Sequence, residues 1–226
     1  MSGELPVVER WTRRSILSVA LCAAGLAALG LGPLLFDANV IDKLTTLFIY
    51  VTLALTWNAL AGYGGLVSVG QQAFFGLGAY AAIRLADAGL NVVAALILAA
   101  ILVGAVSLPI SAIMLRLRAG EFAIGMWVVA ELAHLFVNLD RLVQGETGTS
   151  LIALNVYDAE TRHAMIYGLA LGTLATVAGT LFALLRSPIG AAIQAIRDDE
   201  IAAASVGVRV LATQRLLFVL AATGTA

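Results

Sequence analysis

Long apolar runs, separated by short polar or charged connections, make up most of the 226-residue chain. Six of these runs are close to the roughly 20 residues that a helix needs to cross a bilayer, and a seventh begins near the end of the sequence. The pattern predicts an all-α, polytopic transmembrane helical bundle with about six complete spans plus the start of a seventh. The predicted spans cover residues 15–36, 44–61, 71–88, 91–115, 122–139 and 164–185, and the seventh begins in 211–226.

Composition agrees with a membrane protein. The chain is 61% hydrophobic and 12% charged, with a mean hydropathy of +0.98, whereas soluble domains are roughly 45–50% apolar and about 25% charged. The net charge of −1 gives no bulk attraction to nucleic acid, so we expect the lipid bilayer as a partner and no nucleic acid. The single cysteine, Cys22, provides neither a disulfide nor a metal cluster.

The arginines and lysines predict the orientation, because basic flanks stay on the cytoplasmic side. Nine of the thirteen lie in connections that the span order places inside, and four lie outside. We therefore expect a cytoplasmic tail over residues 1–14, a transmembrane domain over 15–226, an outer connection at 140–163 and a cytoplasmic loop at 186–209. The nine inner residues are Arg10, Arg13, Arg14, Arg116, Arg118, Arg186, Arg197, Arg209 and Arg215.

One stretch, GYGGLVSVGQQAFFGLGAY over residues 62–80, differs from the apolar runs around it. It carries six glycines, a serine, two glutamines and two tyrosines, and no charge. Irregular backbone at membrane depth persists only where protein or a water-filled cavity covers it, so we expect a helix break followed by a helix that lines a polar path. A tight turn followed by a packing helix is the alternative. The candidate path residues are Gly64, Gly65, Ser68, Gln71, Gln72, Phe75, Gly76, Gly78 and Tyr80.

The fifth predicted span contains polar groups at membrane depth. Glu131, His134 and Asn138 are spaced i, i+3, i+7 and share one helix face. An acidic residue at a helix centre costs about 2.5–3.5 kcal/mol on insertion scales, so it faces the bundle interior and is a functional candidate. We add Glu131 and Asn138 to the candidate path. A hydrogen-bond anchor between helices is the alternative.

Two further patterns concern contacts between elements. Gly168 and Gly172 form a G-x-x-x-G in the sixth span, which is typical of a helix-contact face.

In the inner loop, a proline is followed by helix-forming sequence with alternating charge and small residues, which suits docking onto a soluble partner; a solvated surface helix is the alternative. We expect residues 197–207 to form one short helix that Gly207 ends. The candidate residues for coupling this loop to a soluble partner are Arg197, Asp198, Asp199, Glu200, Ala202, Ala203 and Gly207.

From about residue 54 to the end, the chain resembles the branched-chain amino acid ABC transporter permeases of the LivM type. The segments that carry the resemblance are GYGGLVSVGQQAFFGLGAY, RLRAGEFAIGMWVVAELAHLFVN, GETGTS and SPIGAAIQAIRDDEIAAASVGV, in the order in which the family has them. Glu131 occupies the family's glutamate position. The chain departs from the family's patterns at Gln71 and Gln72, at Ile201 where the loop usually has glutamate, and in GETGTS, which lacks one glycine of a pair.

The resemblance implies a subunit of an importer in the inner membrane. Such a subunit pairs with a second permease subunit, usually a different chain, and works with two ABC ATPase subunits and a periplasmic substrate-binding protein. It holds no cofactor and no catalytic or metal site of its own. Branched-chain or other apolar amino acids are the expected solutes. The alternatives are urea or short amides, a secondary transporter, or an intramembrane enzyme that uses Glu131. Because the seventh run has only sixteen residues, we expect a C-terminally truncated fragment of a longer permease.

Overall fold

A computed structural model of the chain describes residues 12–140, 151, 154 and 156–226. The long regular elements in these residues are all helices. In chain order they are α1 (Arg13–Gly30), α2 (Gly32–Leu35), α3 (Ala38–Asn58), the π-helical turn η1 (Ala59–Tyr63), α4 (Gln71–Asp87), α5 (Val92–Met114), α6 (Ala119–Asn138), α7 (Ala159–Arg186), α8 (Pro188–Asp198), α9 (Glu200–Ser205) and α10 (Val210–Thr225).

Five helical segments of the described chain are long and apolar enough to cross a membrane. They are Arg13–Gly30, Ala38–Tyr63, Val92–Met114, Gly120–Asn138 and Ala159–Arg186. α4 has 17 residues and α10 has 16, so each is about 24–26 Å long and shorter than the roughly 30 Å hydrocarbon core. The predicted all-α polytopic bundle is confirmed, whereas the number of complete spans and the side of the N-terminus stay predictions.

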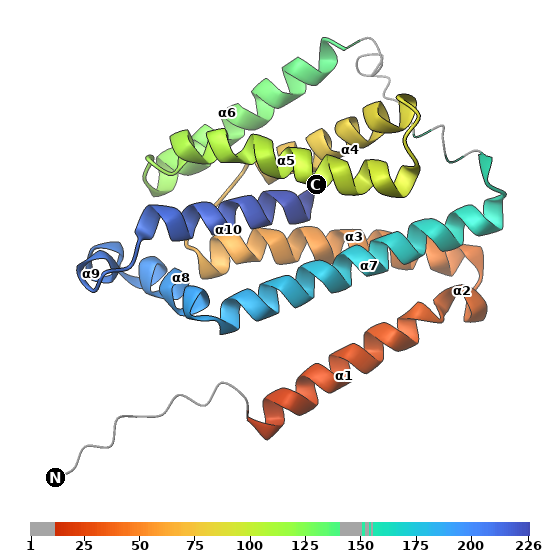
Figure 1. Cartoon of the computed structure of the whole chain (residues 1–226), viewed down its shortest axis with the longest axis horizontal. Helices are drawn as coiled ribbons and strands as arrows, with labels where there is room; N and C mark the ends of the chain where they lie inside the picture. Colours follow the sequence, from red (N-terminus) through yellow and green to blue (C-terminus); the bar gives the residue numbers. More distant parts are fainter. Residues whose placement is uncertain (1–11, 141–150, 152–153, 155) are drawn as a thin grey trace.

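α10 lies in the middle of the bundle, between α5 and α3 (Figure 1). Its Phe218 packs edge-on against Phe74 of α4 and Phe122 of α6, with ring centroids 5.6 Å and 6.3 Å apart. All three side chains are completely buried. Edge-to-face pairs of this kind add about 0.5–1.5 kcal/mol beyond the burial of their area. This aromatic cluster therefore joins α4 and α6 to the central helix.

The α1–α2 turn is attached to the bundle through α7. Tyr167 of α7 packs on Phe48 of α3, with ring centroids 5.3 Å apart, and its hydroxyl donates a 2.6 Å hydrogen bond to the backbone oxygen of Leu29. Gly32 lies directly beneath this hydroxyl, since a Cβ there would approach the Tyr167 Oη to 2.5 Å. The outermost helix is thus held mainly at the end where α1 meets α2 (Figure 1).

The predicted helix break is confirmed. α3 ends in the π-helical turn η1, and residues 64–70 form no regular helix before α4 begins. Gly65 has a φ of +67°, which only glycine adopts without strain. At the far end of the break, Gly70 lies so close to the backbone carbonyl of Met126 in α6 that no side chain fits between them. The break therefore brings the start of α4 directly against α6.

The starts of α3 and α7 meet at the predicted outer end of the bundle. His163 Nδ1 lies 2.6 Å from Asp42 Oδ1, which links the two helices. α7 is capped by Asp158, whose side chain accepts a 3.1 Å hydrogen bond from the backbone N–H of Thr161, and this bond lowers the pKa of Asp158. The motif GETGTS, at 145–150, lies outside the described residues.

Gly168 and Gly172 do not form the predicted helix contact within the described chain. No atom lies within 4 Å of the place where a Cβ would stand on either residue. Both glycines instead line an open, mostly apolar groove of about 600 Å³ between α5, α7 and the end of α10. The small residues are present as the sequence indicates, but no helix among the described residues packs on them.

Candidate functional site

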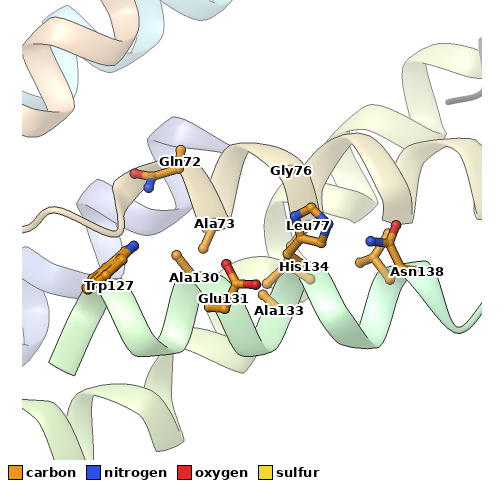
Figure 2. Close-up of a pocket in the computed structure, with 11 residues that line it drawn as sticks. Gln72, Ala73, Gly76, Leu77, Trp127, Ala130, Glu131, Ala133, His134 and Asn138 are labelled. Carbon is orange, nitrogen blue, oxygen red and sulfur yellow. The ribbon is translucent and has the colours of Figure 1, made fainter. Parts of the chain in front are cut away.

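A groove of about 310 Å³ lies between α4 and α6, and Gln72, Glu131, His134 and Asn138 contribute polar side chains to its lining (Figure 2). From α4 it is lined by Gln72, Ala73, Gly76 and Leu77, and from α6 by Trp127, Ala130, Glu131, Ala133, His134, Val137 and Asn138. The predicted i, i+3, i+7 face of α6 is therefore the wall of this groove. Trp127 joins the same face because it precedes Glu131 by four residues.

Among the described residues that line the groove, Glu131 is the only acidic one, and it is exposed rather than facing the bundle interior as expected. It lies about 18 Å from the start of the roughly 30 Å long helix α6, near the middle of the predicted span. Figure 2 shows its carboxylate pointing from α6 toward α4. None of the ion pairs among the described residues includes Glu131. The groove thus carries an unpaired carboxylate at a depth where charge is costly.

The two helices that line the groove are fixed to each other at both ends. At one end, Gly70 sits against the backbone of Met126. At the other, the Tyr80 hydroxyl donates a 2.5 Å hydrogen bond to Asp140 Oδ2, and Arg84 forms an ion pair with the same carboxylate. Between these contacts, Gly76 has no atom within 4 Å of its missing Cβ. The groove exists because α4 presents a bare backbone there.

The predicted cytoplasmic loop folds into two helices, and the expectation of a single helix over 197–207 is wrong. The backbone at Asp199 is extended, with φ −156° and ψ 107°, so α8 ends there and the six-residue α9 begins. The Asp199 side chain accepts hydrogen bonds of 2.9 Å from the backbone N–H groups of Ile201 and Ala202. Asp199 is therefore the N-cap of a new helix rather than part of a continuous one. As predicted, Gly207 ends the segment, with φ +90°.

The two faces of α9 differ. Ala203 is 3% exposed and faces the bundle, whereas Ile201 and Val206 are 83% and 80% exposed. Ala202 and Glu200 are also exposed. The available surface at α9 is thus Ile201 and the following Val206 beside charged Glu200, and a larger side chain at Ala203 would disturb the packing of the bundle itself.

Arg197 connects these helices to the helix break. Its Nη1 donates a 3.1 Å hydrogen bond to the backbone oxygen of Gly62 in η1, and its Nε and Nη2 donate to Asp198. Gly65 packs on the Arg197 stem, since a Cβ on Gly65 would be 3.1 Å from Arg197 Cγ. The end of α8 therefore touches the backbone that leads into α4 and the groove.

The profile of the family "Branched-chain amino acid transport system / permease component" matches residues 39–226. The chain belongs to this family. It is 27% identical, over 90% of its length, to the high-affinity branched-chain amino acid transport system permease protein LivM of Escherichia coli (strain K12), and equally to that of Salmonella typhimurium (strain LT2). It spans about half the length of these relatives, 53% in each case. No solved structure matches. The chain is accordingly a LivM-type, multi-pass protein of the inner membrane.

In this permease, the residues predicted to line the path separate into groups. Gln72, Gly76, Glu131 and Asn138 line the groove. A second set, Gly64, Ser68, Gln71 and Gly78, is buried inside the bundle. Gly65 lies beside Arg197, Phe75 is 43% exposed outside the groove, and Tyr80 binds Asp140. The structure thus brings four of the eleven candidates together in one cavity.

Gln71 belongs to a buried polar network that the sequence did not reveal. Its Nε2 donates a 2.7 Å hydrogen bond to Thr225 Oγ1 and lies 3.3 Å from the backbone oxygen of Ala221. Thr225 Oγ1 is 2.9 Å from Thr56 Oγ1, so the network links α4, α10 and α3. Gln71 therefore anchors the start of α4 rather than lining the groove. Threonines in otherwise apolar helices were the only sequence signal for its partners.

Proposed function

We propose that this chain is the membrane-spanning permease subunit of an ABC importer that moves branched-chain or other apolar amino acids, powered by separate ATPase subunits. Membership of the permease family and the names of the two LivM relatives support this function. The observation that carries it is the groove between α4 and α6, which Gln72, Glu131 and Asn138 line, with Glu131 near the middle of the predicted span.

The open side of the groove supports a second permease subunit as partner. Glu131, His134 and Asn138 are exposed on the described surface, and lipid tails cannot satisfy such groups. A second subunit that covers this side, most simply a different chain, encloses the polar residues and completes a path between the two proteins. A periplasmic binding protein then delivers the solute at the predicted outer end.

The helices α8 and α9 are the proposed docking site for the ATPases, one on each permease subunit. Exposed Ile201 and Val206 provide an apolar contact, and the neighbouring charges Asp198 and Glu200 set its register by complementary pairing. The hydrogen bond from Arg197 to Gly62 then gives ATPase movement a direct route to the helix break.

The test compares Ile201→Arg with Val156→Arg, two exposed aliphatic positions near opposite ends of the bundle, 83% and 86% exposed (Figure 1). A buried unpaired charge opposes docking, so Ile201→Arg should reduce recovery of the ATPase with the tagged permease complex by roughly ten-fold or more. Val156→Arg should leave this recovery unchanged. ATP-driven leucine uptake into proteoliposomes with binding protein is measured in parallel.

Two results would contradict the proposal. Undiminished ATPase recovery with Ile201→Arg would remove α9 from the docking surface. Absence of ATP-dependent uptake of any apolar amino acid by the wild-type complex would contradict the transport function itself.

A further inference from the structure

We infer that Glu131 binds the ammonium group of the transported amino acid. This inference rests on the proposed function and assigns the chemical class of its substrate. It starts from the unpaired carboxylate in the groove, because the described residues offer Glu131 no arginine, lysine or histidine partner within ion-pair distance. Ionisable residues at membrane depth mark substrate or ion pathways, and the ammonium of the solute is the partner that we assign to this carboxylate.

The groove around Glu131 has the composition of a small-molecule site. Its volume of about 310 Å³ lies at the lower end of the range typical of ligand pockets, roughly 300–1,000 Å³. Leu77, Ala130 and the ring of Trp127 provide an apolar wall, which suits an aliphatic side chain. The Trp127 ring lies one helical turn before Glu131 on the same face of α6, and the π-face of such a ring attracts a nearby cation.

Amide groups flank the carboxylate on both sides. Gln72 lies toward the start of α4, and Asn138 lies at the opposite end of the groove, with Glu131 between them (Figure 2). A side-chain amide donates hydrogen bonds to a carboxylate without adding charge. A groove that holds one carboxylate and neutral amide donors suits a zwitterion, whose ammonium takes the charged contact at Glu131.

The same arrangement discriminates against neutral solutes. Urea and short amides carry no cation, so their entry leaves Glu131 without a charged partner. An aliphatic carboxylic acid without an amino group adds a second negative charge and is disfavoured more strongly. We therefore expect selection for the amino group inside the permease, independent of the selection that a binding protein exerts.

The experiment measures equilibrium binding of radiolabelled leucine to the assembled transporter in nanodiscs, with the binding protein left out. Glu131→Gln should weaken leucine binding roughly ten- to hundred-fold, because a hydrogen bond to a charged group is lost. Glu131→Asp keeps the charge and should bind more tightly than Glu131→Gln. Glu160→Gln, the same change at an exposed position in the first turn of α7, is the control and should bind leucine as the wild type does.

Competition on the wild-type transporter tests the same point without a substitution. Unlabelled leucine should displace the label, and 3-methylbutylamine, which keeps the ammonium, should displace it more weakly. In contrast, 4-methylpentanoate, which lacks the ammonium, should not displace it at equal concentration. The competition experiment tests whether the ammonium group is required for binding even if the Glu131→Gln transporter fails to assemble.

The outcomes separate the two proposals. If the wild-type transporter neither binds nor takes up leucine, the proposed function fails and the role of Glu131 fails with it. If the wild type takes up leucine but 4-methylpentanoate competes as well as leucine does, only the role of Glu131 is overturned. Equal leucine binding by Glu131→Gln and wild type overturns it as well. Loss of assembly in both Glu131 variants together with competition by 4-methylpentanoate assigns the carboxylate to a subunit contact instead.

Discussion

At the residue scale, Arg197 makes the one side-chain hydrogen bond in the described chain that joins α8 to η1. Arg197→Met keeps the apolar stem that packs on Gly65 but removes the donor to the Gly62 carbonyl. A charged hydrogen bond that is partly exposed is worth about 1 kcal/mol, so we expect substrate-stimulated ATP hydrolysis and uptake to fall roughly five-fold. ATPase recovery with the permease should stay the same, because Arg197 acts after docking.

Arg116→Met is the matched control for this prediction, since Arg116 is exposed at the same predicted end of the bundle. It should leave uptake unchanged. Equal uptake in Arg197→Met and wild type would show that ATPase movement reaches the pore by another route.

Single residues also show what sequence reasoning can and cannot assign. The sequence places Glu131 and Asn138 on one face of a helix, and both line the groove, because carboxylate and amide groups are conspicuous in an apolar helix and their spacing gives the face. Gln71 and Gln72 are chemically identical neighbours, yet one is buried against α10 and the other lines the groove. The position of Gly70 after the irregular break determines which side of α4 faces α6. Helical periodicity shows which residues share a face, but not which neighbouring helix that face contacts.

At the scale of elements, the contact of Gly70 with the Met126 carbonyl fixes how α4 packs on α6. Gly70→Ala should force the helices apart, because its Cβ overlaps a backbone oxygen that has no freedom to turn away. Overpacking of this kind costs about 1–3 kcal/mol, which corresponds to a decrease of roughly 2–12 °C in the midpoint of thermal unfolding. The measurement is thermal unfolding of the purified protein in detergent.

Gly76→Ala adds the same methyl group six residues later, inside α4, where no atom lies within 4 Å of the added Cβ. Its midpoint should equal or slightly exceed that of the wild type, because alanine is the better helix former. If the unfolding midpoint decreased by a similar amount in both variants, the loss of a glycine in itself would be the cause, and not the Gly70–Met126 contact.

The elements of the predicted cytoplasmic loop show a second difference between the sequence-based expectation and the structure. The charged run at 197–200 predicted one helix, because helix formers dominate the segment. Asp199 is nevertheless a preferred N-cap residue, and its hydrogen bonds to Ile201 and Ala202 start a separate helix. The aspartate that caps α9 is visible in the sequence, but an N-cap aspartate and an aspartate on the charged surface of a continuous helix have the same sequence pattern. Only the extended backbone at Asp199 distinguishes the two cases.

At the scale of the whole molecule, the helix ends gather at two opposite ends of the bundle (Figure 1). α8 and α9 lie at the end where α1 and α6 begin, and α2 lies at the end where α7 begins. This grouping agrees with the excess of arginines that the sequence places inside. The order of spans was predictable because long apolar helices carry a strong and local signal, whereas the helix break and the short α4 depend on contacts with α6 and α10.

Two cysteine positions test which end faces the cytoplasm, after the exposed Cys22 has been replaced by alanine. Glu160→Cys stands in the first turn of α7, and Ser205→Cys stands at the end of α9; both side chains are exposed. The 28-residue α7 between them crosses the bilayer once by its length, at about 42 Å. A membrane-impermeant maleimide should therefore label Glu160→Cys in intact spheroplasts and Ser205→Cys only in inverted vesicles. Labelling of both from one face would contradict the crossing, and reversed labelling would keep the crossing but contradict the orientation derived from the arginines.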